Sequence, residues 1–114
     1  MAPGRGAQIA PDVRTAVVRR DGGCVGARLP DTCSGGLELH HLTNRSQGRD
    51  DSPENLICLC SGHHGWVTRN PEAATLRGFS IPGWVHDDPE LWIIATDWAW
   101  TQRVYAIPGT PPWV

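Results

Sequence analysis

The N-terminal third of the chain carries a single helical pattern of apolar residues. Val13 and Val17 lie four positions apart, and a proline at position 11 and an Asp-Gly-Gly sequence from position 21 bracket the segment. This pattern predicts a helix over about residues 12–20. Residues 1–10 show no apolar periodicity and are expected to form a flexible tail, and the Gly-rich stretch 24–36 is expected to be a loop.

The middle of the chain changes to a strand pattern. Apolar and polar side chains alternate over residues 37–42, which predicts a half-buried strand, and the polar stretch 43–53 predicts a loop. Residues 56–60 are predicted to form a second strand and residues 61–69 a helix. Asn70 is then expected to cap another helix that runs to Gly78.

The C-terminal third is rich in β-branched and aromatic residues. They predict strands over residues 79–85, 91–96 and 103–107, with a turn over 97–102. A chain of 114 residues makes one domain at most. We therefore expect an α+β fold in which the main domain spans residues 11–86 and a small β-rich C-terminal extension, residues 87–114, packs on it.

Four cysteines and a His-His pair indicate a metal site. Cys60 and His63 are separated by two residues, the usual spacing of a chelating turn, whereas Cys24 and Cys33 are separated by eight residues, more than is common. Cys58 lies one residue from Cys60 in an extended segment and is expected to be a core residue. The spacing thus predicts a structural zinc bound by Cys24, Cys33, Cys60 and His63. A domain of this length buries only about 65% of its unfolded surface, so a metal would add needed stability.

The cysteines have a second interpretation, two disulfide bonds in a secreted protein that binds no zinc. The first ten residues contain no apolar run typical of a secretory signal, and no later segment approaches the length that crosses a bilayer. We therefore expect a soluble cytoplasmic protein with no membrane partner. Cysteines in a reducing compartment serve as metal ligands more often than as disulfides, which favours the zinc interpretation.

The charge is distributed unevenly. Up to Arg49, seven arginines face four acidic residues, a net charge of +3, and from Asp50 onward three arginines face eight acidic residues, a net charge of −5. The basic half is expected to contact nucleic-acid phosphate, with Arg19, Arg20, Arg45 and Arg49 as candidate DNA-binding residues. Ordinary solvated surface charge is the alternative for any single arginine.

One stretch, residues 38–71, carries an ordered set of motifs. It contains E-L-H-H, then R-S-Q-G, then D-D-S-P-E-N-L, then a Cys beside H-H-G-W-V, and then N-P. In this order it resembles the HNH endonucleases, especially the small phage-type members. The resemblance covers roughly residues 13–85. It implies a ββα-metal core with a zinc knuckle, preceded by the N-terminal helix.

The resemblance also implies roles for individual residues. His41 would be the general base, because an imidazole with a pKa of about 6.5 can deprotonate water at neutral pH. Its neighbour His40, together with His64 on the following helix, would bind a catalytic divalent metal, which could be Mg²⁺, Mn²⁺, Ni²⁺ or Zn²⁺. Asn55 would brace the loop and orient the base, and Arg45 would hold the phosphate.

The chain departs from its relatives at Thr68. Many relatives carry a third His here, one helical turn after the position of His64, and a hydroxyl is a weak ligand for zinc. Either two imidazoles plus water and phosphate hold the metal, or activity is reduced. We favour the first interpretation, because Mg²⁺ sites keep several waters.

The function implied is that of a metal-dependent DNA endonuclease which hydrolyses phosphodiester bonds in the cytoplasm of a bacterial or phage-infected cell. DNA is the expected partner, and the resemblance to phage members extends this to phage packaging proteins. The alternative is a zinc-ribbon DNA-binding or packaging adaptor module that lacks strong catalysis. Thr68 is the sequence feature that separates the two.

Overall fold

A computed structural model describes residues 9–43 and 50–114. Residues 1–8 of the expected tail (1–10) and the proposed phosphate contacts Arg45 and Arg49 lie outside the described residues. The element order is α1 (Pro11–Asp21), β1 (Leu37–His41), η1 (Pro53–Asn55), β2 (Leu56–Cys60), α2 (Ser61–Arg69), α3 (Pro71–Leu76), α4 (Gly83–His86) and α5 (Pro89–Tyr105).

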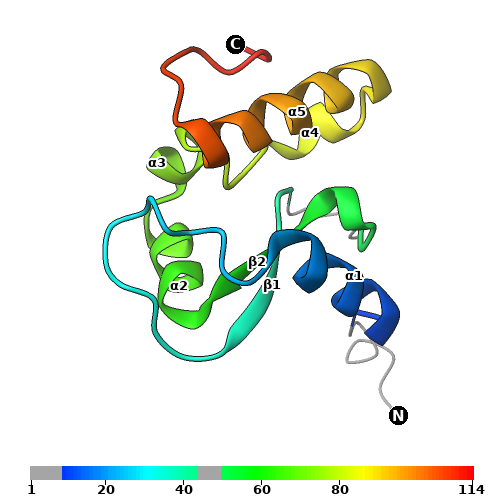
Figure 1. Ribbon diagram of the computed structural model, residues 1–114. Coiled ribbons are helices and arrows are strands. Elements are labelled where there is room, and N and C mark those ends of the chain that lie inside the picture. The colour runs from blue at the N-terminus through cyan, green and yellow to red at the C-terminus, as the bar shows by residue number, and fades with distance from the viewer. Residues whose placement is uncertain (1–8, 44–49) are drawn as a thin grey trace.

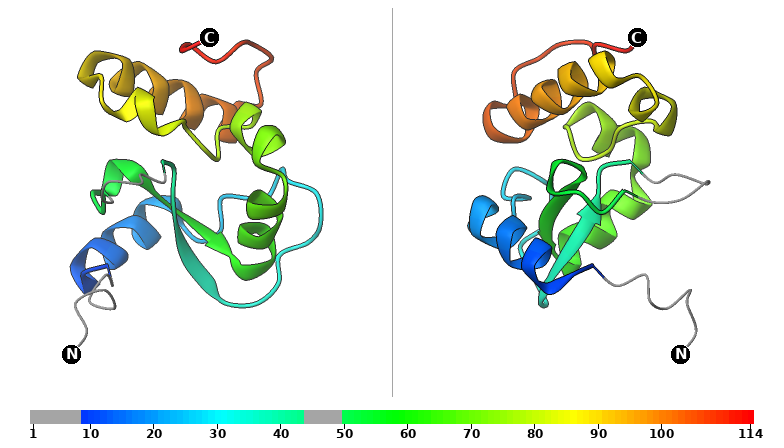
Figure 2. Two further views of the ribbon diagram at one scale, coloured as in Figure 1. Left: turned by 180° about the vertical axis from the view of Figure 1, so that it is seen from behind. Right: turned by 90° about the vertical axis from the view of Figure 1, so that its right-hand side faces the viewer.

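The described elements combine helices with a two-stranded antiparallel sheet, as expected for an α+β fold. Strands β1 and β2 pair in a register that places Leu37 opposite Cys60 and His41 opposite Leu56. Helix α1 covers one face of this hairpin and α2 covers the other (Figures 1 and 2). All five residues of β2 are buried, because both faces of the strand are covered.

The two faces of β2 divide the hydrophobic core into two clusters. Leu56 and Cys58 pack with Val17 of α1. Ile57 and Leu59 point to the opposite face and join the larger cluster. The free edge of β2 is also used, because the backbone N–H of Cys58 donates to the Asp21 carboxylate at 2.8 Å and the Val25 N–H donates to the Cys58 carbonyl at 2.9 Å.

The C-terminal region forms a helical layer over this core, so the predicted β-rich extension is wrong. Residues 91–96, 97–102 and 103–105 all belong to the single helix α5, residues 79–82 form no strand, and residues 83–85 belong to α4. In Figures 1 and 2, α4, α5 and the C-terminal segment lie on one side of the hairpin layer. Ala95 and Ala99 bury the inner face of α5 against the larger cluster.

Local signals in the sequence account for α5. The Asp88 carboxylate accepts hydrogen bonds from the N–H groups of Glu90 and Leu91, and Pro89 occupies the first helical turn, where its missing N–H costs nothing. Buried residues recur at 95, 99 and 102, which is helical spacing. Packing of this small-residue face outweighs the β propensity of the neighbouring isoleucines and tryptophans.

A glycine just after helix α3, Gly78, sets the distance between the layers. Helix α3 stops at Leu76, two residues before the predicted end, and the side chain of Asn70 donates to the Trp66 carbonyl instead of capping it. Gly78 has a φ of 83°, and the Phe79 N–H donates to the Ala74 carbonyl at 2.9 Å, which is a Schellman motif. A Cβ at Gly78 would lie 2.2 Å from the Ala99 carbonyl oxygen. The loop after α3 therefore touches the backbone of α5 directly.

Candidate metal centre and histidine pocket

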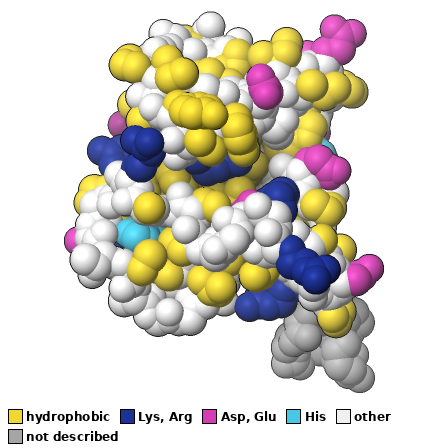
Figure 3. Space-filling model, in the orientation of Figure 1, with side chains coloured by type: hydrophobic (Ala, Val, Ile, Leu, Met, Phe, Trp, Pro, Cys, Tyr) yellow, Lys and Arg dark blue, Asp and Glu magenta, His cyan; other side chains and the backbone are white. Residues whose placement is uncertain are grey.

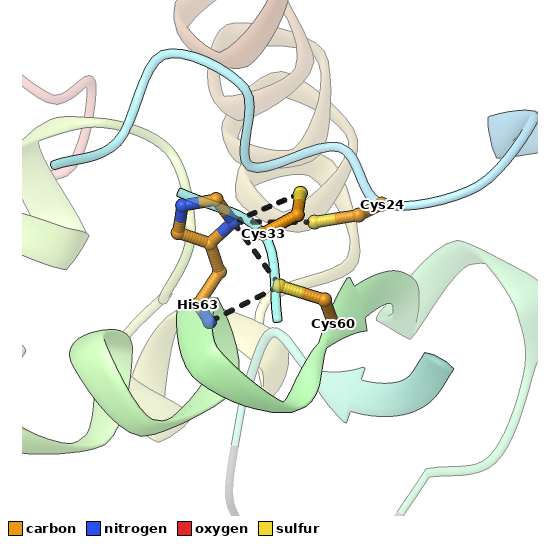
Figure 4. Close-up of side chains that lie close together, drawn as sticks. All are labelled: Cys24, Cys33, Cys60 and His63. Atoms are coloured by element: carbon orange, nitrogen blue, oxygen red, sulfur yellow. Dashed lines mark hydrogen bonds between the residues drawn. The ribbon is translucent and has the colours of Figure 1, made fainter. Parts of the chain in front are cut away.

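Three cysteines and one histidine converge beside the first turn of α2, as the spacing predicted. Cys60 and His63 come from the junction of β2 and α2, and Cys24 and Cys33 come from the loop between α1 and β1 (Figure 4). Their ligand atoms all lie within 4.8 Å of one another. These four residues could hold a metal ion such as zinc.

The separations within this cluster match a tetrahedral zinc site. The Nδ1 atom of His63 lies 3.5 Å from the sulfur of Cys24, 3.5 Å from that of Cys33 and 3.3 Å from that of Cys60. Zinc bonds of about 2.3 Å to sulfur and about 2.0–2.1 Å to nitrogen give tetrahedral S to N edges of about 3.5 Å. The donor set of three thiols and one imidazole is also one that structural zinc uses.

Neighbouring backbone groups hold the histidine in place. The Nε2–H of His63 donates to the Asp31 carbonyl at 3.1 Å, which leaves Nδ1 directed at the sulfurs. The Cys60 sulfur accepts the His63 backbone N–H at 3.3 Å and so caps α2. A Cβ at Gly26 would lie 3.0 Å from the His63 ring, so a larger residue here would force the ring or the loop to shift.

The thiols do not ionise alike. Burial opposes ionisation of Cys60, but hydrogen bonds from the N–H groups of His63 and Ser34 and from the thiols of Cys33 and Cys24 together outweigh it and lower the pKa of Cys60 to about 6. Hydrogen bonds with Cys24 and Cys60 raise the pKa of Cys33 to about 11. One thiolate therefore forms readily, whereas a second beside it is disfavoured. A divalent cation would offset the charge of all three sulfurs.

The fourth cysteine lies outside the cluster. Cys58 is fully buried and packs with Val17 and Leu56 under α1. Strand alternation alone would place Cys58 and Cys60 on the same side of β2, but the chain turns into α2 at Cys60, whose sulfur caps that helix and lies in the cluster, whereas Cys58 stays under α1. Cys58 acts as a small apolar residue of the core.

A second group of imidazoles lines a pocket of about 230 Å³. Its walls include His40 and His41 at the end of β1, and His64 and Thr68 on α2. The rings of His40 and His64 lie 5.1 Å apart between centroids. The pocket therefore brings together the two imidazoles expected to bind a catalytic metal, the expected base and the residue that replaces a third ligand.

The imidazole of His41 is oriented by a carboxylate. Its Nε2 lies 2.8 Å from Oδ1 of Asp51, so that Nε2 carries the proton and Nδ1 carries a lone pair. Buried Asn55 holds the segment that delivers Asp51: its Oδ1 accepts the Thr43 N–H at 3.0 Å and its Nδ2 donates to the Asp50 carbonyl at 2.8 Å. Asn55 thus braces the two ends of the loop and acts on His41 only indirectly, through the segment that carries Asp51.

The other two imidazoles each donate one ring N–H to an oxygen. Nε2 of His40 donates to the Phe79 carbonyl at 2.7 Å, and Nδ1 of His64 donates to the Glu38 carboxylate at 2.6 Å. Burial lowers the pKa of His40 to about 4, with further contributions from His64 and His41, so this imidazole is neutral at pH 7. Hydrogen bonds from Ser61 and His64 lower the pKa of Glu38. A neutral imidazole with its second nitrogen unprotonated can bind a metal.

The pocket does not assemble three metal ligands as the cysteine cluster does. Among residues 9–43 and 50–114, the cysteine cluster is the one group in which three or more His, Cys, Asp or Glu ligand atoms lie within 4.8 Å of one another. The Thr68 hydroxyl donates to the His64 carbonyl at 2.9 Å. Two imidazoles fit an ion that keeps most of its shell as water and phosphate oxygen.

The arginines expected to bind DNA differ in their surroundings. Arg19 is exposed. The guanidinium of Arg20 donates to the Asp21 carboxylate and to the carbonyls of Pro53 and Leu56, so it joins α1 to η1 and β2. DNA contact by either residue stays a prediction.

Sequence reasoning missed Glu38 and Asp51 as partners of the histidines. Glu38 lies two residues before His40 and therefore on the same face of β1, a signal that was present in the strand pattern. Asp51 reaches His41 across a loop, and no spacing rule predicts that contact. His86, which the sequence left without a role, donates to Asp50 at 2.7 Å.

Within the described part of the chain, no helix combines the length and apolar character that a bilayer crossing requires. Comparisons with family models, with curated proteins and with solved structures found no match to this chain.

Proposed function

We propose that this protein is a metal-dependent endonuclease of the HNH type that hydrolyses DNA phosphodiester bonds. The observation that supports this most is the arrangement around one pocket of a carboxylate-oriented imidazole, His41, and two further imidazoles, His40 and His64. Phosphodiester hydrolysis needs a base for water and a positive charge near the phosphoryl oxygens. The pocket offers residues for both.

Each pocket residue then has a distinct task. His41 accepts the proton of the attacking water on Nδ1, while Asp51 stabilises the imidazolium that results. His40 and His64 would hold a divalent ion, which offsets charge on the phosphate and on the departing oxygen. Glu38 fixes the ring of His64 with its unprotonated nitrogen free for such an ion. Asn55 keeps the loop that carries Asp51 in place.

The cysteine cluster has a structural task in this proposal. A zinc held by Cys24, Cys33, Cys60 and His63 would tie the long loop to the β2–α2 junction, one residue before His64. Closed sites with four protein ligands stabilise a fold and leave no open position for a substrate. Zinc here would therefore support the histidine pocket without taking part in the reaction.

Nicking of a supercoiled plasmid tests the proposal. Zinc-loaded protein is incubated with Mg²⁺, Mn²⁺, Ni²⁺ or added Zn²⁺, and His41→Ala should lower the rate by about 10²–10⁴-fold, the usual contribution of a general base. Zinc content and DNA affinity should not change. His86→Gln is a matched control that removes an imidazole outside the pocket, and it should lower the rate far less. Equal rates for wild type and His41→Ala would rule out His41 as the base.

One observation favours the non-catalytic alternative. Thr68 stands on the wall of the histidine pocket with its hydroxyl engaged by the backbone of α2, so the pocket offers a catalytic ion two imidazoles only. A zinc-containing DNA-binding or adaptor module needs no second ion. DNA binding without nicking under all four metals would support that module.

A further inference from the structure

A further pocket, separate from the cysteine cluster and from the histidine pocket, is lined by arginines. It has a volume of about 270 Å³ and lies where the loop between α1 and β1, the end of α3 and the last turn of α5 meet. Arg28, Arg77, Arg103 and Gln102 supply its polar wall, and Leu29 and Phe79 supply apolar surface. Figure 3 shows arginine atoms gathered beneath α5, in the hollow between the two layers. Among the residues that the structure describes, no Asp or Glu lines this pocket.

No carboxylate of the described residues lies in direct contact with the three guanidiniums. Within the described ranges, neither Arg28, Arg77 nor Arg103 forms an ion pair with a carboxylate. Arg103 donates to the Gly78 carbonyl at 2.6 Å, a neutral acceptor that uses one of its five N–H groups. Burial lowers the pKa of Arg103 to about 10, even though the Asp21 carboxylate acts in the opposite direction, so holding this cation away from water has a cost that the described residues do not offset fully. An anion in the pocket would offset that cost.

The backbone around the pocket is fixed independently of any ligand. Gly78 packs against the Ala99 carbonyl, so Arg77 and Arg103 are held on adjoining backbone segments. The Arg77 guanidinium lies over the Trp66 ring at 5.3 Å, which limits its motion while leaving its edge available. Arg28 sits in the loop between Cys24 and Cys33, which the cysteine cluster anchors at both ends.

From this geometry we infer that the pocket binds a phosphate group. Three planar guanidiniums and the side-chain amide of Gln102 offer more N–H donors than one carboxylate can accept, whereas a phosphate accepts on three or four oxygens. The charge of the wall also suits a dianion better than a monoanion. The phosphate can belong to a nucleic-acid backbone or to a free phosphate or phosphate ester, since the chemistry of recognition is the same.

This pocket does not depend on the proposed cleavage chemistry. None of its lining residues lines the histidine pocket or belongs to the cysteine cluster. Loss of phosphate binding should therefore leave the response to His41→Ala unaltered. A protein without nuclease activity would still bind phosphate here.

Titration of the zinc-loaded full chain with inorganic phosphate, followed by NMR of the arginine Nε–H groups, tests the inference. Sodium chloride at equal ionic strength controls for screening. Saturable shifts are expected at Arg28, Arg77 and Arg103. Arg28→Gln and Arg77→Gln change exposed side chains, and each should weaken phosphate binding about tenfold or more, as expected for a charge-assisted pair. Arg69→Gln is the matched control, an exposed arginine on α2 that does not line the pocket, and it should have little effect.

A second titration, with a short DNA duplex and no added divalent metal, identifies the source of the phosphate. Competition between DNA and inorganic phosphate for the same three signals would assign the pocket to the nucleic-acid backbone. Phosphate binding without such competition would assign it to free phosphate or its esters. Absence of saturable shifts with both ligands would overturn the inference. An equal loss of affinity in Arg69→Gln and Arg77→Gln would overturn it as well.

Discussion

Cys58 and Cys60 are two residues apart in β2, yet they face different environments. Cys60 points into the cysteine cluster, and Cys58 is buried under α1. Cys60→Ala should release zinc and unfold much of the domain, because structural zinc contributes on the order of 10 kcal/mol to folding in small peptides. Cys58→Ala removes the same atom from the core and should retain one zinc per chain, at a cost of about 1–2 kcal/mol. Zinc content by mass spectrometry and urea unfolding would check both variants, and equal zinc loss would contradict the ligand assignment.

Thr68 gives a second comparison at the level of one side chain. Residues 64 and 68 lie one turn apart on α2, and both line the histidine pocket. Thr68→His should therefore add a third imidazole and raise the affinity of this pocket for Ni²⁺ or Zn²⁺, with the cysteine cluster unaffected. Isothermal titration of zinc-loaded wild type and variant measures the change. No gain in affinity at the second site would show that residue 68 does not reach the ion.

Residue spacing predicts the parts of the candidate sites that lie close together in sequence. The spacing of Cys60 and His63 matches one helical turn, which predicted both residues as ligands. Because Cys58 was expected in the core, the remaining cysteines, Cys24 and Cys33, were predicted to complete the site. Contacts such as Asp51 with His41 depend on the path of a loop, which no local pattern encodes. Arg28, Arg77 and Arg103 come from three separate segments of the chain. Their position around one pocket therefore could not be predicted from the sequence.

At the scale of elements, substitution of two glycines with positive φ would distinguish the cost of backbone strain from the cost of a steric clash. Gly22 ends α1 with a φ of 71° and open space where a Cβ would lie, whereas Gly78 follows α3 with a φ of 83° against the Ala99 carbonyl. Gly22→Ala should cost about 1–2 kcal/mol from backbone strain alone. Gly78→Ala should cost about 2–5 kcal/mol, because overpacking adds to the same strain. Urea unfolding of the two variants should show this difference, and equal costs would mean that the layers separate easily at α3.

The hairpin and the first three helices could be predicted because each has a clear period and a clear boundary. The α5 helix could not, since its outer face carries Ile93, Ile94 and Trp100, which are 68%, 53% and 49% exposed. Apolar residues on both the inner and outer faces hide the helical period. The cap at Asp88 and the spacing of Ala95 and Ala99 were the sequence signals that still indicated a helix.

At the scale of the whole molecule, two histidines join the helical layer to the hairpin layer. His40 on β1 donates to the Phe79 carbonyl before α4. His86 on α4 donates to Asp50 and packs its ring against Trp92 at 4.6 Å between centroids. The position of α4 and α5 is thereby coupled to the strand that carries the proposed base.

This coupling makes stability depend on pH. The pKa of His40 falls from about 6.5 in the unfolded chain to about 4 in the folded protein, so between these values the unfolded state binds more protons. Stability should therefore rise with pH across this window: the contribution is fully present above about pH 6.5 and is lost as pH falls through about 4. At about 1.4 kcal/mol for each pKa unit, its upper limit is about 3 kcal/mol.

His40→Gln tests this dependence, because its amide can still donate to the Phe79 carbonyl but does not titrate. Urea unfolding of zinc-loaded protein at intervals between pH 4 and 7 gives the free energy of unfolding for wild type and variant. Protonation of carboxylates and release of zinc affect both proteins alike, so the difference between the two curves isolates His40. The wild type should lose more stability than His40→Gln as pH falls. Parallel curves would mean that His40 is protonated without loss of its contact between the layers.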